Sequence, residues 1–489
     1  MTSDHNPYAR PPPDVFVFAH VADEHGADFM PAGSLEGANT TQPVFVYGKR
    51  YVQRPYAVEV DPVALPMRDE EGGAKRFVLA GLTEFGGIRD AAPDSWGRRV
   101  IENKLKVAAN KLPEVAYLLE TGSDRVGALD VRLTRDSKAT APVSAETDLA
   151  RLLEAADRIE NEEYVGDDLA IYFGSLGSAG GARPKASVRT DDGVLWLAKF
   201  PSNSDRACNA VLEAGAMELA RAAGLRVPPV KVMQVGHAKV LFVRRFDRYW
   251  AEPGVVPDPD KESWVLLEGP KSLQSIEGRI GFCSALTLMG IDEHDATRSS
   301  YKALAEKMRA RALPQYLARD LRELFKRQAL NIFVTNNDDH LRNHGFLYQV
   351  AAKGWTLSPL YDVLPMSVVA QERMLHLEVG ERGRLATLDN LMTHWAVYFS
   401  SKVEALKALH EVWLVARAWK PFFEKFGASQ KGHGAPGGGH SELGPNCSSG
   451  ARKNATGLPG LKLLRESASR WKSRRNLPGS ASRITKVVT

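Results

Sequence analysis

The sequence predicts an α+β protein in which a strand-rich first half precedes a helix-rich second half. Short alternating or β-branched apolar runs, typical of strands, occur up to about residue 250. After about Gly281 the apolar residues recur at helical spacing instead. The chain has 489 residues, which is too long for one compact core and suits two or three domains.

Composition argues against several classes of protein. The chain is 44% hydrophobic and 25% charged, and its three cysteines are far apart without a CxxC pair. Neither a disulfide framework nor a structural zinc site is therefore expected. The N-terminus lacks the apolar stretch of a signal peptide, and no segment approaches about eighteen consecutive apolar residues. We expect a cytoplasmic protein that makes no membrane contact.

Charge is distributed unevenly along the chain. The net charge is +5, but residues 431–489 alone carry eleven Lys and Arg against two Glu. The remainder is therefore net acidic, which does not support a nucleic-acid-binding body. We expect 428–489 to be a basic, disordered tail, because its Gly/Ser-rich composition offers little apolar surface to bury.

The first unit, 13–135, is expected to be a mixed α+β subdomain. A polar linker, 134–148, and an amphipathic helix, 149–163, then fill most of 136–170. The elements expected in the first unit are strands at 15–20 (VFVFAH), 43–48 (PVFVYG) and 56–62 (YAVEVDP), and a helix at 94–105 that begins after a Pro–Asp cap.

The second unit, 171–427, is expected to have two lobes, with strands in 171–250 and helices in 275–427. Its strands are predicted at 186–190, 194–200, 227–235 and 238–246, with a DDG turn joining the first two. Its helices are predicted at 211–225, 284–290, 301–312, 316–335 and 402–419. A seam between two lobes often holds a functional site.

A Gly-rich stretch, GSLGSAGGARPK (174–185), opens this unit. Small residues such as Gly180 and Gly181 let backbone N–H groups approach a polyphosphate, and Arg183 and Lys185 suit its charge. The stretch does not match the Walker A pattern. A plain Gly/Ser linker is the commoner interpretation of such a stretch taken alone.

Two charged residues follow at positions that suit phosphate binding. Lys199 ends the strand VLWLAKF, from which it could reach phosphates beneath the Gly-rich stretch, or simply extend to solvent. Glu213 lies fourteen residues later on the next predicted helix. It could hold the Lys199 ammonium in place or be an ordinary solvated charge.

The polar stretch NNDDHLRNHGF (336–346) places Asp338 and Asn343 at the spacing D-x-x-x-x-N. In kinases this spacing puts a base at the substrate hydroxyl and an amide oxygen on Mg²⁺. Asp362, nineteen residues after Asn343, is the candidate for the second metal ligand. Oxygen ligands without a thiolate favour Mg²⁺. Gly-rich loop, lysine, glutamate, D-x-x-x-x-N and aspartate follow the order of a two-lobed kinase.

The histidines of this stretch suggest an alternative, a divalent-metal hydrolase. His340 and His344 are four residues apart and would share the face of a helix. However, the HEXXH pattern is absent, because Leu341 follows His340. We favour a role for His340 in orienting the loop by hydrogen bonding, and a structural role for His344.

The chain resembles HipA-type serine/threonine kinases, the toxins of bacterial toxin–antitoxin pairs, from about Pro13 to about Phe426. The matching motifs are AAPDSWGRR (91–99), SDRVGALDV (123–131), SAGGARPKA (178–186), WLAKFP (196–201), VRRFDR (243–248), NDDHLRNHGF (337–346) and LSPLYDVLP (357–365). The resemblance implies a two-lobed protein-kinase-like fold. It implies a strand-rich N-terminal lobe with an extra α+β subdomain and a mostly helical C-terminal lobe.

The resemblance also implies residue roles. Asp338 would be the catalytic base, Asn343 and Asp362 the Mg²⁺ ligands, and Lys199 an ATP-phosphate contact. Arg244 and Phe246 would contact the adenine, with His340 among the ATP-site residues. Ser178 would be the autophosphorylated serine, with Ser175 a less favoured choice.

The substrate and partner also follow only from the resemblance. The activity would be transfer of the ATP γ-phosphoryl group to a protein serine, with an aminoacyl-tRNA synthetase as one substrate class. The partner would be a helix-turn-helix antitoxin that provides most of the DNA contact. Two alternatives stay open: a kinase-like partner of that antitoxin in transcriptional autoregulation, and a kinase of a small molecule.

The chain departs from the family pattern at four places. Arg342 stands where lysine is frequent, and Arg244 where glutamate is frequent. A long Pro-rich segment lies between Phe246 and Gly281, and the tail 428–489 has no counterpart.

Overall fold

A computed structural model describes the chain over residues 7–67, 76–140, 144–166, 169–172, 181–256, 269–296, 299–366 and 372–428. Of the residues proposed for the site, Gly180 and the serines Ser175 and Ser178 lie outside these ranges, as does the tail from residue 429. Among the described helices, none combines the length and apolar character needed to cross a membrane.

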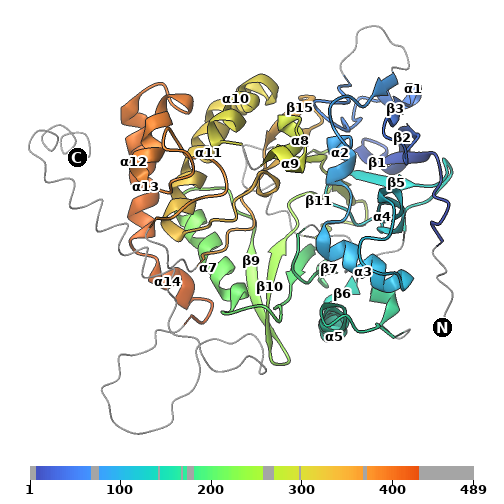
Figure 1. Cartoon of the computed structure of the whole chain (residues 1–489), viewed down its shortest axis with the longest axis horizontal. Helices are drawn as coiled ribbons and strands as arrows, with labels where there is room; N and C mark the ends of the chain where they lie inside the picture. The colour runs from blue at the N-terminus through green and yellow to red at the C-terminus, as the bar shows by residue number, and fades with distance from the viewer. Residues whose placement is uncertain are drawn as a thin grey trace, which may run out of the picture.

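The first unit is built on a five-stranded antiparallel sheet with the order β4-β3-β2-β1-β5. Alternating residues of its first strand are fully buried, Val15 and Val17 among them, so one face of the sheet covers a core. The elements are β1 (Val15–Asp23), β2 (Gly26–Glu36), β3 (Val44–Tyr47), α1 (Lys49–Val52), β4 (Arg76–Val78), α2 (Gly86–Asp90), α3 (Ser95–Leu105), α4 (Glu114–Glu120) and β5 (Leu129–Arg132) (Figure 1).

The strand predicted at 56–62 is wrong. These residues form no strand beyond a single bridge at Asp61, because side chains satisfy their backbone. Val58 N donates to the Tyr51 hydroxyl at 2.9 Å, and Val60 N donates to the Tyr47 hydroxyl at 3.0 Å. The tyrosine hydroxyls replace the neighbouring strand that the alternating pattern predicts.

The strands of the second unit form another five-stranded sheet, in the order β6-β7-β8-β10-β9, which also takes in β6 from before residue 171. Its edge strand β6 comes from the segment predicted to be a linker, and it pairs with β7 in parallel. The elements are β6 (Ser144–Ala145), α5 (Leu149–Glu160), β7 (Lys185–Arg189), β8 (Leu195–Lys199), α7 (Asn209–Ala222), β9 (Val230–Val235) and β10 (Ala238–Arg244).

Helices cover both faces of this sheet. Val240 and Phe242 on β10 pack in one core with α5 and with Trp96 of α3. Leu241 and Val243 point to the other face and pack in the core that contains α7. The alternation along β10 therefore docks a helix of the first unit onto the sheet of the second.

The remainder of the second unit is mostly helical and lies beside this sheet (Figure 1). Its longest helix, α11, is buried from Leu324 to Val334. The elements are β11 (Arg248–Ala251), β12 (Ile276–Arg279), β13 (Phe282–Ser284), α8 (Ala285–Met289), α9 (Glu293–Ala296), α10 (Tyr301–Arg311), α11 (Pro314–Val334), β14 (Gly345–Gln349), β15 (Gly354–Leu357), α12 (Leu388–Leu391), α13 (Lys402–Ala416) and α14 (Lys420–Glu424). The predicted α+β fold class and the order of strands before helices are confirmed.

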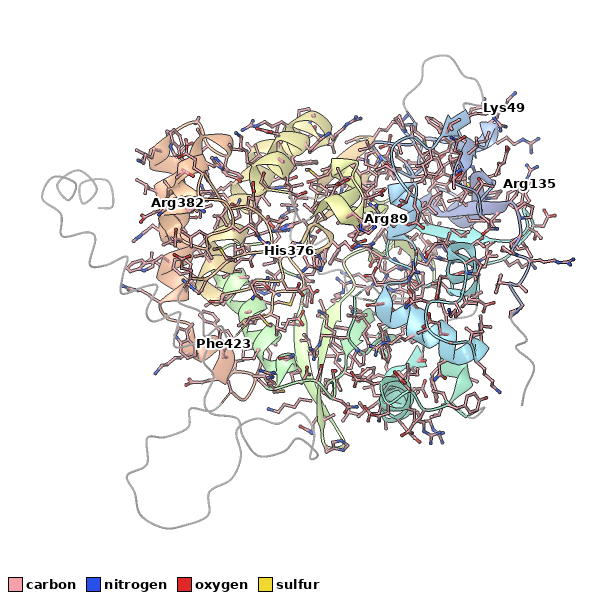
Figure 2. All side chains as sticks on the ribbon, viewed as in Figure 1. Lys49, Arg89, Arg135, His376, Arg382 and Phe423 are labelled. Carbon is pink, nitrogen blue, oxygen red and sulfur yellow. The ribbon has the colours of Figure 1, made fainter. Side chains whose placement is uncertain are left out.

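Polar contacts fasten the first unit to the helical part. Arg89 on α2 forms an ion pair with Asp292 at 3.3 Å, and it lies at the seam between the two (Figure 2). Asp90 accepts hydrogen bonds from the backbone and side chain of Ser284 at 2.6 and 2.8 Å. The Trp355 indole donates to Glu59 at 2.7 Å.

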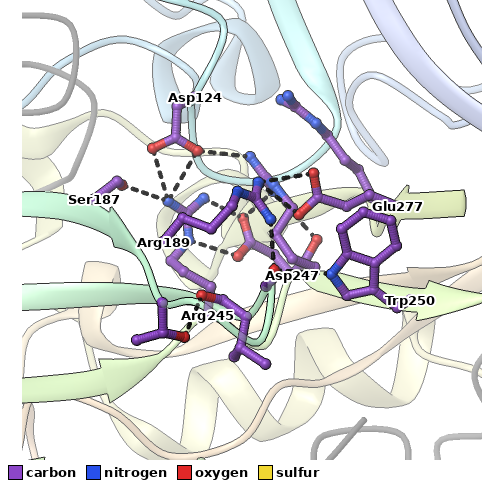
Figure 3. Close-up of polar contacts among 12 residues, drawn as sticks. Asp124, Ser187, Arg189, Arg245, Asp247, Trp250 and Glu277 are labelled. Carbon is purple, nitrogen blue, oxygen red and sulfur yellow. Dashed lines mark hydrogen bonds and ion pairs between the residues drawn. The ribbon is translucent and has the colours of Figure 1, made fainter. Parts of the chain in front are cut away.

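A buried charge cluster fastens the first unit to the strand-rich lobe (Figure 3). Asp247 accepts hydrogen bonds at 2.7 Å from the guanidinium groups of Arg245 and Arg248 and from the backbone of Gly127. Asp124 pairs with both arginines at 3.4 Å. The two units thus share one charged, buried junction next to the segment that links the lobes.

Candidate active site

A cavity of about 1410 Å³ lies where the first unit, the strand-rich lobe and the helical lobe meet. Its walls include all the residues proposed for the site that the structure describes. They are Gly181, Arg183, Lys185, Lys199, Glu213, Arg244, Phe246, Asp338, His340, Asn343 and Asp362. Positions spread over about 180 residues of sequence thus line a single space.

Lys199, at the end of β8, is the centre of the polar contacts in the cavity. Its ammonium group donates to Glu213 Oε1 on α7 at 2.6 Å and to Asp362 Oδ1 at 2.7 Å. Glu213 is therefore placed where it can hold the lysine. Asp362 contributes a second carboxylate to the same ammonium.

The three charges perturb one another. Although burial lowers the pKa of Lys199, Asp362 and Glu213 outweigh it and hold that pKa above its ordinary value. Lys199 in turn holds the pKa of Asp362 well below its ordinary range. Burial raises the pKa of Glu213. Lys199 and Asp362 thus stay ionised as a pair at neutral pH.

Lys185 is a second buried cation in the cavity. It begins β7, directly opposite Lys199 in the β7–β8 register, and only 4% of it is exposed. Burial, together with the charge of Lys199, lowers the pKa of Lys185 to about 8. Two closely placed lysines make this end of the cavity suitable for a polyanion.

The catalytic-loop candidate follows α11 directly. Thr335 ends that helix in the left-handed conformation, with φ of 60°, and the chain then enters the cavity wall. Asn343 lies in a 3₁₀ turn, and its amide nitrogen donates to the Asp338 carbonyl at 2.8 Å. This bond ties the two ends of the D-x-x-x-x-N segment together.

Burial distinguishes the two neighbouring aspartates. Asp338 is exposed and lines the cavity, whereas Asp339 is 2% exposed. Asp339 accepts hydrogen bonds from the hydroxyl of Tyr301 and from the Asn331 amide, and it pairs with His344 at 3.1 Å. Asp338 is therefore the carboxylate that can reach a substrate, while Asp339 supports the loop from below.

The two histidines do not share a helix face, contrary to expectation. His340 precedes the 3₁₀ turn and lines the cavity, whereas His344 follows the turn and is fully buried against Asp339. Their separation across the turn puts them in different environments. The contacts of His344 accord with a structural role.

Asp362 adopts an unusual backbone conformation, with φ of 58°, in the left-handed region. Aspartate and asparagine enter this region more readily than other residues with a side chain. The conformation aims a carboxylate at Lys199 while 45% of the side chain stays exposed. One carboxylate oxygen is thus bonded to the ammonium and the group remains open to the cavity.

The residues fit a Mg²⁺ ion. Asp362 offers a carboxylate, and Asn343, whose amide nitrogen is bonded to Asp338, offers its amide oxygen. Within the described ranges there is no group of three or more His, Cys, Asp or Glu side chains that could hold a metal. The site proposed here is not such a cluster. It would use one carboxylate and one amide oxygen from the protein, with water and phosphate as the other ligands.

The residues proposed at the link between the lobes also line the cavity. Arg244 ends β10 and is 5% exposed. The Phe246 ring lies 5.5 Å from the Tyr361 ring, centroid to centroid. Arg183, in contrast, is bonded to Asp205, so part of its charge is already compensated.

Three residues that sequence reasoning did not assign to the site line the cavity or support its wall. Tyr361 donates its hydroxyl to the Arg342 carbonyl at 2.7 Å, and Asp339 supports the loop as described. Asp94 lines the cavity from the first unit and accepts a hydrogen bond at 3.1 Å from Arg342, which lies within the D-x-x-x-x-N segment. All three stand inside motifs quoted for the resemblance, which is the signal that could have found them.

Comparisons with known proteins agree with this arrangement. Residues 177–419 match the model of the HipA-like C-terminal domain family. A curated Sinorhizobium fredii protein, "Putative kinase Y4mE" (strain NBRC 101917 / NGR234), is 29% identical over 334 residues. The match covers 62% of this chain and 69% of that protein.

A solved structure shares the fold. It is a chain from the Shewanella oneidensis MR-1 toxin–antitoxin complex of HipA, HipB and operator DNA, with a TM-score of 0.61 and 14% identity. The alignment covers 94% of this chain and 97% of that one. At this identity the likeness concerns the fold alone. Residues 177–419 of the chain thus belong to the HipA-like C-terminal domain family.

Proposed function

We propose that the protein is a Mg²⁺- and ATP-dependent protein serine/threonine kinase. One observation carries this proposal. Lys199, bonded to both Glu213 and Asp362, opens on the same cavity as the exposed carboxylate of Asp338. Phosphoryl transfer needs phosphates held by charge beside a base that orients a hydroxyl, and this cavity offers both.

Each residue has a role in the proposed reaction. Asp338 accepts the proton of the acceptor hydroxyl, and Lys199 and Lys185 hold the ATP phosphates. Asn343 and Asp362 hold Mg²⁺, which when bound offsets the negative charge of the β- and γ-phosphates. Arg244 and Phe246 contact the base of the nucleotide. Ser178, proposed as an autophosphorylation site, lies outside the described residues.

The proposed biological role is that of a growth-inhibiting toxin. The family and the fold shared with a chain from a HipA–HipB–DNA complex support a helix-turn-helix antitoxin as partner. An aminoacyl-tRNA synthetase is the proposed class of protein substrate.

The test is phosphate transfer from labelled ATP by the purified chain, to itself and to proteins of a cell extract. Asp338→Asn keeps the shape of the side chain but removes the base. General base catalysis contributes on the order of 10²–10⁴-fold, so incorporation should fall by about that factor. Glu306→Gln, which changes an exposed carboxylate on α10 outside the cavity, should leave it unchanged.

Equal incorporation by wild type and Asp338→Asn would refute the assignment of the base. Label that appears only in small molecules, and in no protein, would refute the protein-kinase proposal in favour of a small-molecule kinase.

A further inference from the structure

Asp94 stands at the N-cap of α3, yet its side chain makes no hydrogen bond to its own helix. An N-cap aspartate ordinarily accepts from a backbone N–H of the first turn, which stabilises the helix. Here the carboxylate bonds to other segments. Oδ2 accepts from Gly181 N at 2.5 Å, and Oδ1 accepts from Arg342 Nη1 at 3.1 Å.

These two partners belong to two different segments that line the cavity. Gly181 lies in the Gly-rich stretch that leads to Lys185, and its φ of 101° is open to glycine but strained for other residues. Arg342 lies between Asp338 and Asn343, in the 3₁₀ turn of the catalytic loop. One carboxylate of the first unit therefore joins the phosphate side of the cavity to the side that holds the base.

Further contacts from α3 hold the same Gly-rich stretch. Trp96 N donates to Gly181 O at 3.2 Å, and the Trp96 indole donates to Lys185 O at 3.0 Å. Arg99 donates to Ala182 O at 2.9 Å. Since Trp96 is fully buried, this helix turn is a fixed platform for the backbone from 181 to 185.

Charge explains why Arg342 accompanies Asp94. A bare carboxylate near bound phosphates would repel them, but the guanidinium of Arg342 offsets its charge. Glu293 accepts two further hydrogen bonds from Arg342, at 2.9 and 2.7 Å, and fixes the direction of that guanidinium. Asp94 and Arg342 thus form an oriented ion pair that links the two loops.

We propose that Asp94 is a positioning residue for the ATP phosphates. It sets the backbone of residues 181–185 relative to the catalytic loop, so that the first unit, outside the matched family segment, determines phosphate binding. The proposal rests on the proposed kinase function. A positioning role for Asp94 differs from a role in stabilising the fold alone. Loss of its bonds to Gly181 and Arg342 should weaken the binding of phosphates but leave the binding of the nucleoside unchanged.

The experiment compares the binding of ATP and adenosine by the purified full chain, measured by calorimetry. Asp94→Ala should weaken ATP binding about tenfold or more, the usual effect of losing a hydrogen bond to a charged group. Adenosine affinity should stay within about twofold of wild type. Lys104→Gln, on the same helix, breaks only an exposed ion pair with Glu120 and should change neither affinity.

A second variant, Arg342→Gln, keeps the proposal testable if Asp94→Ala is poorly folded, and with folded variants the two changes define a double-mutant cycle. Arg342→Gln leaves the Asp94 charge uncompensated, so it should also weaken ATP binding. Asp94→Ala combined with Arg342→Gln should cost less affinity for ATP than the sum of the two single changes, because the residues act through one bond. Urea unfolding of each variant checks that the fold is intact.

Several outcomes would overturn the proposal. Unchanged ATP affinity in Asp94→Ala, an equal loss of ATP and adenosine affinity, or strictly additive effects in the cycle would each do so. A wild-type chain that binds no ATP would instead refute the proposed function itself, so the two failures are distinguishable.

Discussion

Lys185 and Lys199 face each other across two paired strands, but their environments differ. Lys199 has two carboxylates in contact, which keep its pKa high. Burial and the neighbouring charge of Lys199 lower the pKa of Lys185 to about 8. One lysine is thus permanently charged at neutral pH, while the other titrates within the range of an ordinary assay.

This difference predicts a pH dependence. A lysine is cationic below its pKa, so Lys185 is charged below about pH 8 and loses its charge as pH rises through that value. The kcat/KM for ATP, which reports ionisations of the free enzyme, should be level below pH 8 and decline above it. Initial rates between pH 6.5 and about 9.5 measure this.

Lys185→Met keeps an unbranched side chain one heavy atom shorter and removes the charge. This variant should have a lower kcat/KM throughout and no inflection near pH 8. The same inflection in wild type and variant would show that another group is responsible.

Sequence spacing was sufficient to predict which proposed site residues lie close together within one segment or on successive elements. Asp338 and Asn343 are five residues apart, and Lys199 and Glu213 lie on successive elements, so local order predicted their proximity. Asp94 could not be placed in this way. Its partner Arg342 is 248 residues away, and a Pro–Asp pair before a helix is already explained as a cap.

At the scale of elements, α7 and α14 approach each other closely. Phe423 on α14 is fully buried against α7. A Cβ at Gly215 would lie 2.5 Å from the Phe423 ring, which explains a glycine in the middle of α7 despite its cost to helix stability. The last described helix is therefore part of the core beneath Glu213.

Removing this contact should destabilise the protein. Phe423→Ala, at the position marked in Figure 2, leaves a cavity and should lower the free energy of unfolding by about 3–5 kcal/mol. Phe422→Ala, next to it and only partly buried, is the matched control and should cost less. Urea denaturation of both variants measures the difference. Equal losses would mean that burial against α7 is not what stabilises α14.

Helices and strands were predictable where neighbouring backbone groups make the hydrogen bonds. They were less predictable where side chains distant in sequence bond to the backbone. The helices α7, α8, α10, α11 and α13 and the strands β7, β8, β9 and β10 lie where periodicity placed them. The segment 56–62 alternates like a strand, but tyrosine hydroxyls take its hydrogen bonds. The strand β6 lies in a polar stretch whose pairing with β7 leaves no local pattern.

At the scale of the whole molecule, the buried cluster around Asp247 joins the first unit to the second. Burial alone would raise the pKa of Asp247, but Arg245 and Arg248 hold it well below its ordinary value. Removing one partner from such a cluster leaves buried charges without compensation. The junction is therefore expected to be sensitive to single changes.

Asp247→Asn should lower the free energy of unfolding by about 3–5 kcal/mol, the usual cost of breaking a buried ion pair. Glu36→Gln breaks an exposed pair with Arg76, 2.7 Å long, and should cost less than about 1 kcal/mol. Chemical denaturation at pH 7 compares them. Similar small losses in both would show that the junction contributes little to stability.

The sign of the pH effect follows from the depressed pKa of Asp247. A carboxylate whose folded pKa lies below its unfolded value stabilises the fold above the unfolded pKa, about 3.9, and less as pH falls. The difference in stability between wild type and Asp247→Asn should therefore shrink below about pH 4.

The same cluster has a consequence for the order of events during synthesis. Gly127 N bonds to a carboxylate 120 residues further along the chain. At about 5–20 residues per second, that carboxylate leaves the ribosome on the order of ten seconds after Gly127. The first unit therefore leaves the ribosome before the partner of Gly127 N has been synthesised. It completes this hydrogen bond only after the strand-rich lobe, which contains Asp247, has followed.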